Sequence, residues 1–190
     1  MIYRVHLRLF IVGMIVSTAS LFPSLFFAQA PANPKTVSEL PPPSERWALV
    51  IGINKYDDPN LNPLYGQNDA KKIAADLKQY AGFDPDQIIL LTDDQRADHQ
   101  PKRERILYWL SALKQYASPQ GLLLVFFSGH GMEVKGEDFL MPQDAHLSFD
   151  KDYLEQNAIP VESVSKSIRE SCAPASAVRT KTPYPIEKLS

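Results

Sequence analysis

Residues 121–131 carry the sequence Gly-Leu-Leu-Leu-Val-Phe-Phe-Ser-Gly-His-Gly, an apolar run that ends in a histidine between two glycines. A continuous apolar run is typical of a strand that is buried on both faces of a sheet. Similar runs occur at residues 47–53 and 88–91, and apolar residues with helical spacing predict helices over 67–81 and 102–117. This alternation predicts an α/β fold with a mainly parallel sheet and helices on both of its faces.

Shorter signals complete the expected order of elements. An Asn-Asp pair at 68–69 lies at the start of the first predicted helix, where side-chain acceptors cap free amides, and Gly82 follows its end as a C-cap. Gly136 indicates a hairpin turn, with residues 139–141 as the returning strand. A weaker helical pattern covers residues 161–171.

The bulk composition suits one globular domain. The chain has 190 residues, a formal net charge of -2 and 44% hydrophobic residues. This balance gives no indication of a nucleic-acid partner, and no motif indicates a cofactor. Cys172 is the single cysteine, which excludes an internal disulfide framework and a multi-cysteine zinc site. Its thiol is then either structural or a nucleophile.

Residues 1–30 have the pattern of a secretory signal peptide. A short basic region precedes an apolar run over residues 9–27, and Ala28-Gln29-Ala30 has the small-x-small pattern of a signal peptidase site. Pro23 interrupts the run and favours a cleaved signal over a membrane span. We therefore expect an exported chain, periplasmic or secreted, without a stable membrane span. The alternative is an uncleaved signal that anchors the chain in a membrane.

Proline marks the other boundaries of the expected domain. Residues 31–45 are rich in proline and predict an extended linker, because proline fixes φ and removes a hydrogen-bond donor. The domain itself is expected over residues 46–171. Residues 172–190 contain further prolines and predict an irregular tail.

His130 is the leading candidate for a catalytic residue. Right-handed crossovers place the carboxyl ends of parallel strands at one edge of the sheet, where ligands and catalytic groups collect. The glycines beside His130 leave room for a substrate backbone and free amides for a developing oxyanion. Imidazole is suited to accept a proton from a thiol or hydroxyl at neutral pH. The alternatives are a turn histidine, or a zinc site with Asp144 and His146 that no helical spacing supports.

Four segments together resemble the caspase and metacaspase peptidase family, in particular its bacterial caspase-like proteins. They are residues 47–56, 64–70, 124–131 and 139–144, and the Ser-Gly-His-Gly after an apolar strand is fairly specific. The resemblance extends over residues 46–171. It implies a caspase-hemoglobinase fold, a three-layer sandwich, and a cysteine-type endopeptidase with a Cys-His dyad. Some metacaspases need calcium, but no cluster of calcium ligands is evident in this sequence.

The resemblance also implies roles for individual residues. His130 would be the general base, and the amide of Gly131 would donate to the oxyanion. Ser128 and the loop around Asp57 would lie near the pocket for the residue before the cut, which is often Arg or Lys in such bacterial relatives. Asp58 is adjacent to Asp57 and equally available. A serine hydrolase that uses Ser128 is a weaker alternative, because Ser128 lies two positions from His130 on an extended segment.

The chain departs from the family pattern at the nucleophile. In the family the cysteine ends the next strand, about 4.8 Å from its parallel neighbour. Here Cys172 precedes the place of that strand, and no long apolar run follows. The gene is then interrupted before the nucleophile strand, or the chain is an inactive interaction module, or Cys172 is an unorthodox nucleophile in a tail that gives it no fixed position. We expect missing C-terminal strands, impaired turnover and an exposed edge on the third strand, open to a partner.

Overall fold

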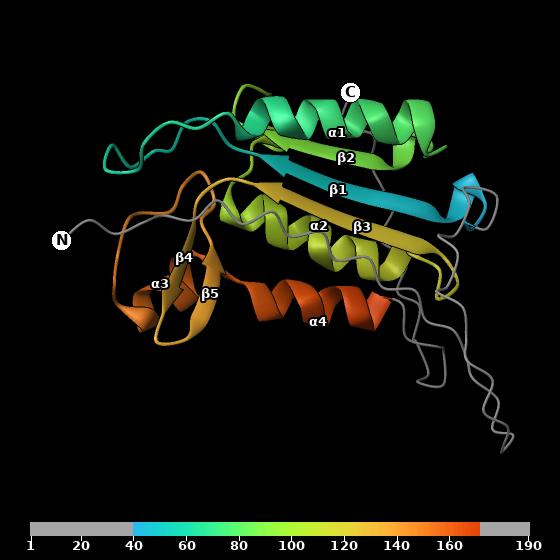
Figure 1. Ribbon diagram of the computed structural model, residues 1–190. Helices are drawn as coiled ribbons and strands as arrows, with labels where there is room; N and C mark the ends of the chain where they lie inside the picture. The colour runs from blue at the N-terminus through green and yellow to red at the C-terminus, as the bar shows by residue number, and fades with distance from the viewer. Residues whose placement is uncertain (1–39, 172–190) are drawn as a thin grey trace, which may run out of the picture.

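A three-stranded parallel sheet forms the centre of the protein in the computed structural model, which describes residues 40–171 (Figure 1). β1 spans Arg46–Gly52, β2 spans Ile88–Thr92 and β3 spans Leu122–Ser128. The strand order is β2-β1-β3, with both pairs parallel. The three strands predicted from apolar runs are therefore confirmed, with β1 in the middle of the described sheet.

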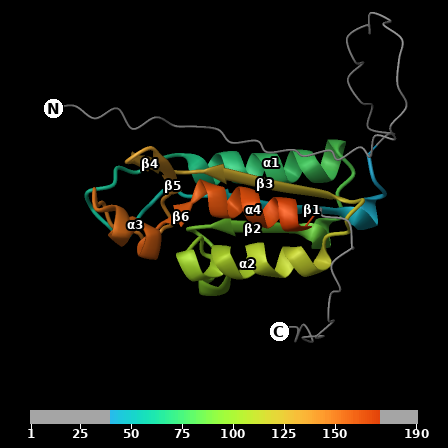
Figure 2. The ribbon, with the colours of Figure 1, turned by 90° about the horizontal axis from the view of Figure 1, so that it is seen from below.

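Helices cover both faces of this sheet, as predicted. α1 (Gly66–Tyr80) packs on one face, whereas α2 (Arg103–Tyr116) and α4 (Val161–Ser171) lie on the other (Figures 1 and 2). The layers are thus helix, sheet and helix. All three helices lie where their apolar spacing predicted them, within one or two residues.

The central strand β1 supplies both hydrophobic cores. Val50 packs in the cluster that includes residues of α1, and its neighbours Leu49 and Ile51 pack in the cluster that includes residues of α2 and α4. Val50 is paired with Leu90 of β2 and with Phe126 of β3. A strand that buries alternate side chains on opposite faces has no polar face, which explains the continuous apolar run in the sequence.

A small antiparallel sheet follows β3 in the chain. β4 spans Gly131–Val134 and β5 spans Glu137–Leu140, and β6 (Ile159–Pro160) pairs with β5. The turn at Lys135–Gly136 has positive φ at both residues, 52° and 79°, which confirms the predicted hairpin. The sequence analysis did not predict β6 or the short helix α3 (Lys151–Asn157).

Two residues outside α1, Gly82 and Arg46, stabilise its carboxyl end. Gly82 has a φ of +64°, and the N–H of Phe83 donates to the carbonyl of Leu77 at 3.2 Å, so the predicted C-cap is confirmed. The guanidinium of Arg46 donates to the carbonyls of Ala81 and Gly82 at 2.6 and 3.3 Å. A buried cation at this end of a helix also complements the helix dipole.

The amino end of α1 is capped differently from the prediction. The expected capping role of Asn68 and Asp69 is wrong, because no side chain of the local segment caps the helix. The side-chain oxygen of Asn54 instead accepts from the N–H of Gln67 at 2.8 Å. The acceptor therefore comes from the end of β1, which leaves the Asp69 carboxylate available for another contact.

The last residues of the predicted linker pack against the domain. Pro43–Glu45 form a 3-10 helix, and the carbonyl of Ser44 accepts from the side-chain amide of Gln87 at 3.0 Å. Two further 3-10 helices, Pro85–Gln87 and Ala97–His99, flank β2. The predicted signal peptide and the tail from residue 172 lie outside the described residues. Between residues 40 and 171, no helix is long and apolar enough to cross a membrane.

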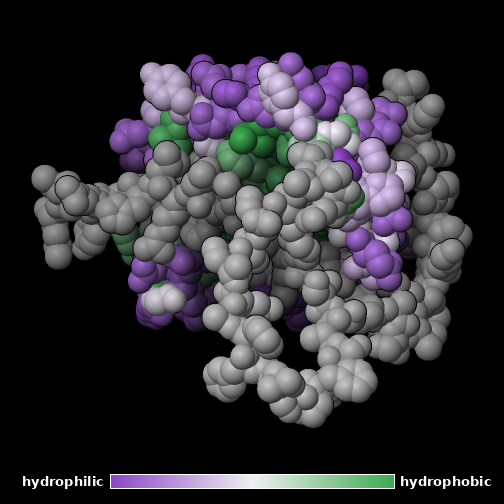
Figure 3. Space-filling view, turned by 45° about the vertical axis from the view of Figure 1, so that its right-hand side comes forward, coloured by the Kyte–Doolittle hydropathy of each residue, from purple (hydrophilic) through white to green (hydrophobic). Residues whose placement is uncertain are grey.

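The outer edge of β3 borders an apolar hollow. Within the described residues β3 pairs with β1 alone, and the expected lack of a further strand beside it stays a prediction. A hollow of about 290 Å³ lies beside it, formed by residues of α1 and β3 that include Leu77, Tyr80, Leu124 and Phe126. Figure 3 shows a hydrophobic patch below the hydrophilic upper surface of the molecule. A partner at this edge stays a prediction.

Candidate active site

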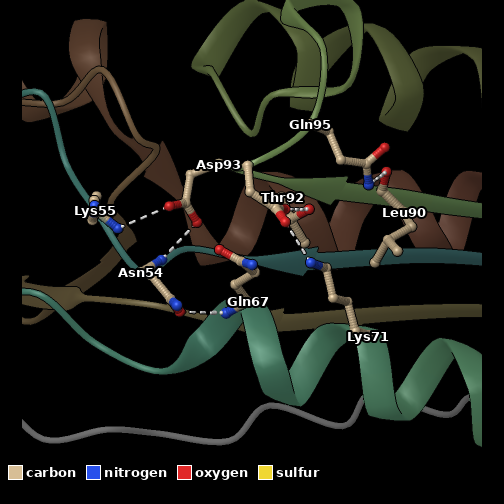
Figure 4. Close-up of polar contacts among 9 residues, drawn as sticks. Asn54, Lys55, Gln67, Lys71, Leu90, Thr92, Asp93 and Gln95 are labelled. Carbon is tan, nitrogen blue, oxygen red and sulfur yellow. Dashed lines mark hydrogen bonds and ion pairs between the residues drawn. The ribbon is translucent and has the colours of Figure 1, made fainter.

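The loop between β1 and α1 is anchored at the carboxyl edge of the sheet (Figure 4). The N–H of Asn54 donates to the carboxylate of Asp93, which follows β2, at 2.8 Å. The carbonyl of Asn54 accepts from the N–H of Leu64 at 2.8 Å and closes the loop. The side-chain oxygen of Asn54 also accepts from the N–H of Gln67, so Asn54 joins the ends of β1 and β2 to the start of α1. The loop that starts there faces the segment after β3.

His130 lies directly after β3 at this edge. Its ring atom Nε2 is 2.8 Å from the carbonyl oxygen of Asn62, in the anchored loop. A carbonyl only accepts, so Nε2 carries the proton and Nδ1 is the unprotonated, basic nitrogen of the neutral ring. The residue is 8% exposed. The imidazole is therefore held in one tautomer and one orientation at the rim of the sheet.

Tyr56 forms the other wall of the histidine site. Its hydroxyl accepts from the backbone N–H of His130 at 2.7 Å, and the two rings lie 5.0 Å apart between centroids. Burial raises the pKa of Tyr56, so the phenol stays protonated. A Cβ atom on Gly129 would lie 2.7 Å from this hydroxyl and 2.9 Å from Cζ of Phe127. Gly129 is thus needed for the close approach of Tyr56.

Within residues 40–171, the backbone amide of Gly131 points away from its partner strand. Gly131 is paired with Leu140, and the N–H of Met141 donates to the carbonyl of His130 at 3.0 Å. This pattern makes Gly131 and Leu140 a non-hydrogen-bonded pair, whose N–H and C=O groups point away from the partner strand. A Cβ on Gly131 would make only an ordinary contact, 3.5 Å from the carbonyl of Phe139. The space and the amide are both available to a substrate.

Ser128 joins the end of β3 to the first turn of α1. Its hydroxyl donates to Oδ2 of Asp69 at 3.0 Å, and its carbonyl accepts from the N–H of Ile53 at 3.0 Å. Ser128 is buried, whereas Asp69 is exposed. Ser128, two residues before His130 in the chain, is therefore hydrogen-bonded to an exposed carboxylate.

The part of the chain that carries this histidine is similar to known proteins. The profile of the caspase domain family matches residues 45–175. The chain belongs to this family. Metacaspase-1 of Candida glabrata is 40% identical over 95 residues, which are 49% of this chain and 24% of that protein. Metacaspase-1 of Yarrowia lipolytica is 39% identical over 96 residues, 50% of this chain and 20% of that protein.

The family and the fold class predicted from the sequence are thereby confirmed. The metacaspase-1 of Botryotinia fuckeliana is also similar, with 36% identity over 96 residues and 22% of its length covered. The chain thus spans a quarter or less of these relatives. They support a caspase-like peptidase domain, whereas the activity and the substrates of the whole protein are proposals.

The two adjacent aspartates of the caspase-like loop differ in their surroundings. Asp58 is 4% exposed, and the backbone N–H groups of Leu147 and Asn60 hold its pKa below the usual value. Asp57 is exposed and contributes its N–H to the carbonyl of Gln143 at 2.9 Å. Between residues 40 and 171, no hydrogen bond joins the Asp57 carboxylate to Ser128 or His130. The acid that the fold brings to Ser128 is Asp69.

Cys172, the other predicted member of the dyad, lies outside the described residues. The roles of His130, Gly131 and Ser128 stay predictions, although their geometry suits them. The zinc alternative gains no support, because no cluster of three metal-binding side chains occurs between residues 40 and 171. His146 lies near the Asp58 carboxylate instead, and Asp144 accepts from the N–H of Arg103.

Sequence reasoning gave no role to Tyr56 and Asn62, and it considered Asp58 only for the substrate pocket and Asp69 only as a helix cap. Tyr56, Asn62, Asp58 and Asp69 all act through contacts with segments far away in the chain. One local signal was present, since Asp58-Pro59 followed by Asn60 is typical of a turn that starts with an acidic acceptor. The other three contacts have no signature in a single sequence.

Proposed function

We propose that this chain is a caspase-like, cysteine-type endopeptidase domain in which His130 is the general base, and that its turnover is impaired. The observation that carries the proposal is the contact between Nε2 of His130 and the Asn62 carbonyl, which leaves Nδ1 as the base. Nδ1 takes the thiol proton while the thiolate attacks the substrate carbonyl carbon. The oxyanion accepts a hydrogen bond from the N–H of Gly131. The C–N bond breaks as His130 returns the proton to the leaving amine, and water then hydrolyses the thioester and restores the thiol.

The proposed impairment is supported by the place of Cys172 in the sequence. Residues 40–171 contain no cysteine, so no described side chain serves as the nucleophile beside His130. Cys172 is the remaining cysteine of this sequence, and a cysteine nucleophile needs a lowered pKa and a place beside the imidazole. We expect slow cleavage of a dye-labelled arginyl peptide by the full chain, with loss of that cleavage in His130→Gln. Equal rates for both proteins would overturn the proposal.

The second candidate function is a catalytically inactive interaction module. The absence of a cysteine among the described residues favours it, together with the apolar hollow beside the outer edge of β3. This alternative predicts saturable peptide binding without turnover. Isothermal titration with the same peptide distinguishes the two candidates, because binding without cleavage supports the module and rejects the peptidase.

We assign the preference for Arg or Lys to Asp69 rather than to Asp57. Support comes from the hydrogen bond that the hydroxyl of Ser128 donates to the exposed Asp69 carboxylate. Asp69→Asn should weaken binding of an arginyl peptide by about tenfold or more, since a charge-assisted contact to a guanidinium is lost. Binding of the same peptide with norleucine in place of arginine should not change.

Asp57→Asn is the matched comparison. It removes the same charge from the loop that the family resemblance places near the substrate pocket. A selective loss of arginyl peptide binding in this variant, with Asp69→Asn unaffected, would return the pocket to Asp57. Fluorescence anisotropy of the labelled peptides measures both variants at one salt concentration, which keeps screening constant.

We further propose that the chain is exported by residues 1–30, with a membrane anchor as the alternative. Support comes from the basic, apolar and small-x-small segments of the sequence. Expression in a bacterium with a periplasm should yield a protein that lacks about thirty residues. Mass spectrometry of the periplasmic fraction checks this, and a full-length protein in the membrane fraction would support the anchor.

A further inference from the structure

The turn that carries the Asn62 carbonyl to His130 is built around one buried carboxylate. Oδ1 of Asp58 accepts from the backbone N–H of Asn60 at 2.9 Å and from its side-chain amide at 2.8 Å. The carbonyl of Asp58 also accepts from the N–H of Leu61 at 3.1 Å. These contacts fold the chain back on itself immediately before Asn62. The direction of the Asn62 carbonyl is therefore set by this turn.

The second oxygen of the same carboxylate ties the turn to another part of the domain. Oδ2 of Asp58 accepts from the N–H of Leu147 at 2.7 Å, and Nδ1 of His146 lies 3.8 Å away. The segment of Leu147 follows β5 and starts at Met141, whose N–H donates to the carbonyl of His130. The ring contact and the backbone contact of His130 are thus fixed against the same segment.

A second link strengthens this arrangement next to Asp58. The N–H of Asp57 donates to the carbonyl of Gln143, and the N–H of Gln143 donates to the carbonyl of Pro101 at 3.0 Å. These are backbone contacts, which a change of side chain leaves in place. Asp58 is the side chain that hydrogen-bonds the turn to the segment after β5, whereas Leu61 adds apolar packing against Met141 and Ala145. Its two oxygens serve two separate sets of donors.

We propose that Asp58 is a positioning residue that holds the Asn62 carbonyl on Nε2 of His130. The contact keeps the proton on Nε2 and leaves Nδ1 as the basic atom. The inference deepens the proposed function and depends on it for the role of His130. A carboxylate suits this task because both of its oxygens only accept, whereas an asparagine offers one oxygen and would present N–H groups to one set of donors.

The decisive measurement is the Nε2-bound proton of His130 in the full chain. An imidazole proton exchanges slowly with water only while it is held in a hydrogen bond, so NMR of protein with ¹⁵N-labelled histidine detects the Asn62 contact directly. The loss of the signal in His130→Gln assigns it. We expect a protected signal in the wild type. In Asp58→Asn its exchange should accelerate by about tenfold or more, because a buried charge-assisted contact is lost.

Asp57→Asn is the matched control, since it makes the same chemical change one residue away at an exposed carboxylate. Its His130 signal should stay protected. Equal acceleration in both variants, or an unchanged signal in Asp58→Asn, would overturn the inference. Amide exchange in β1 and β3 shows whether the sheet is intact. If Asp58→Asn does not fold, Leu147→Pro decides, because it removes the donor to Oδ2 and should accelerate the same exchange.

The inference and the proposed function fail separately. A signal that responds as expected in a protein without any His130-dependent cleavage would reject the peptidase and retain the positioning role. Cleavage that depends on His130 but not on Asp58, with an unchanged Nε2 signal in Asp58→Asn, would reject the positioning role alone.

Discussion

Gly66→Ala should lower the free energy of unfolding by about 3 kcal/mol, because the added methyl group would overlap the backbone of two strands. A Cβ at Gly66 would lie 2.2 Å from the carbonyl oxygen of Ser128 and 2.9 Å from that of Ile53. Both are backbone atoms at the ends of β3 and β1, so neither yields as a flexible side chain would. The start of α1 must move, and the contact between Ser128 and Asp69 is lost with it.

Gly131→Ala is the matched control for this prediction. Its Cβ would meet only the carbonyl of Phe139 at an ordinary 3.5 Å. Alanine is also favoured over glycine in a strand, so the stability of this variant should change by less than about 1 kcal/mol. Urea unfolding followed by the fluorescence of Trp47 and Trp109 measures both variants. Similar losses of unfolding free energy in both variants would mean that the contact with Ser128 does not set the position of α1.

The sequence predicted the central layers of the fold because each of their elements carries its own signal. The strands are buried on both faces and have uninterrupted apolar runs, and α1, α2 and α4 have apolar residues at helical spacing. Gly82 and Gly136 have positive φ, which L-residues rarely adopt, so both turns were evident from composition. These signals are local, so each element of the central sheet can be predicted without knowledge of its partners.

The short elements after β5 have weaker signals. α3 has seven residues and β6 has two, so neither is long enough for a periodic pattern. One cap was visible, because the side chain of Asp150 accepts from the N–H groups of Asp152 and Tyr153 at the start of α3. An acidic residue before a polar stretch is also frequent in loops, so this pattern does not distinguish a short helix from a loop.

The roles of the acidic residues could not be derived from the sequence for a related physical reason. Asp69 has the position of a helix cap, but Asn54 supplies that acceptor from the end of β1. Asp57 and Asp58 are chemically identical neighbours, and only the burial of Asp58 against Leu147 separates them. A carboxylate takes its role from the donors that the fold brings to it, and those donors come from distant segments. The histidine was easier, because two glycines and a strand surround it in the sequence itself.

His130→Gln should reduce hydrolysis of an arginyl peptide by at least about 100-fold, the usual contribution of a general base. Glutamine is preferable to alanine, since its side-chain amide retains a donor for the Asn62 carbonyl and so protects the loop. Thermal unfolding should therefore be little changed. The expected loss concerns proton transfer, because the amide of glutamine has no basic nitrogen to replace Nδ1.

Cys172→Ala makes this prediction specific to a Cys-His mechanism. If the thiol of Cys172 is the nucleophile, both variants should lose cleavage to the same extent, because the members of a dyad act as one unit. If cleavage survives Cys172→Ala but not His130→Gln, His130 activates another group, and the cysteine mechanism is wrong for this chain. The double variant tests the unit directly: a further loss beyond either single variant would show that the two residues contribute independently.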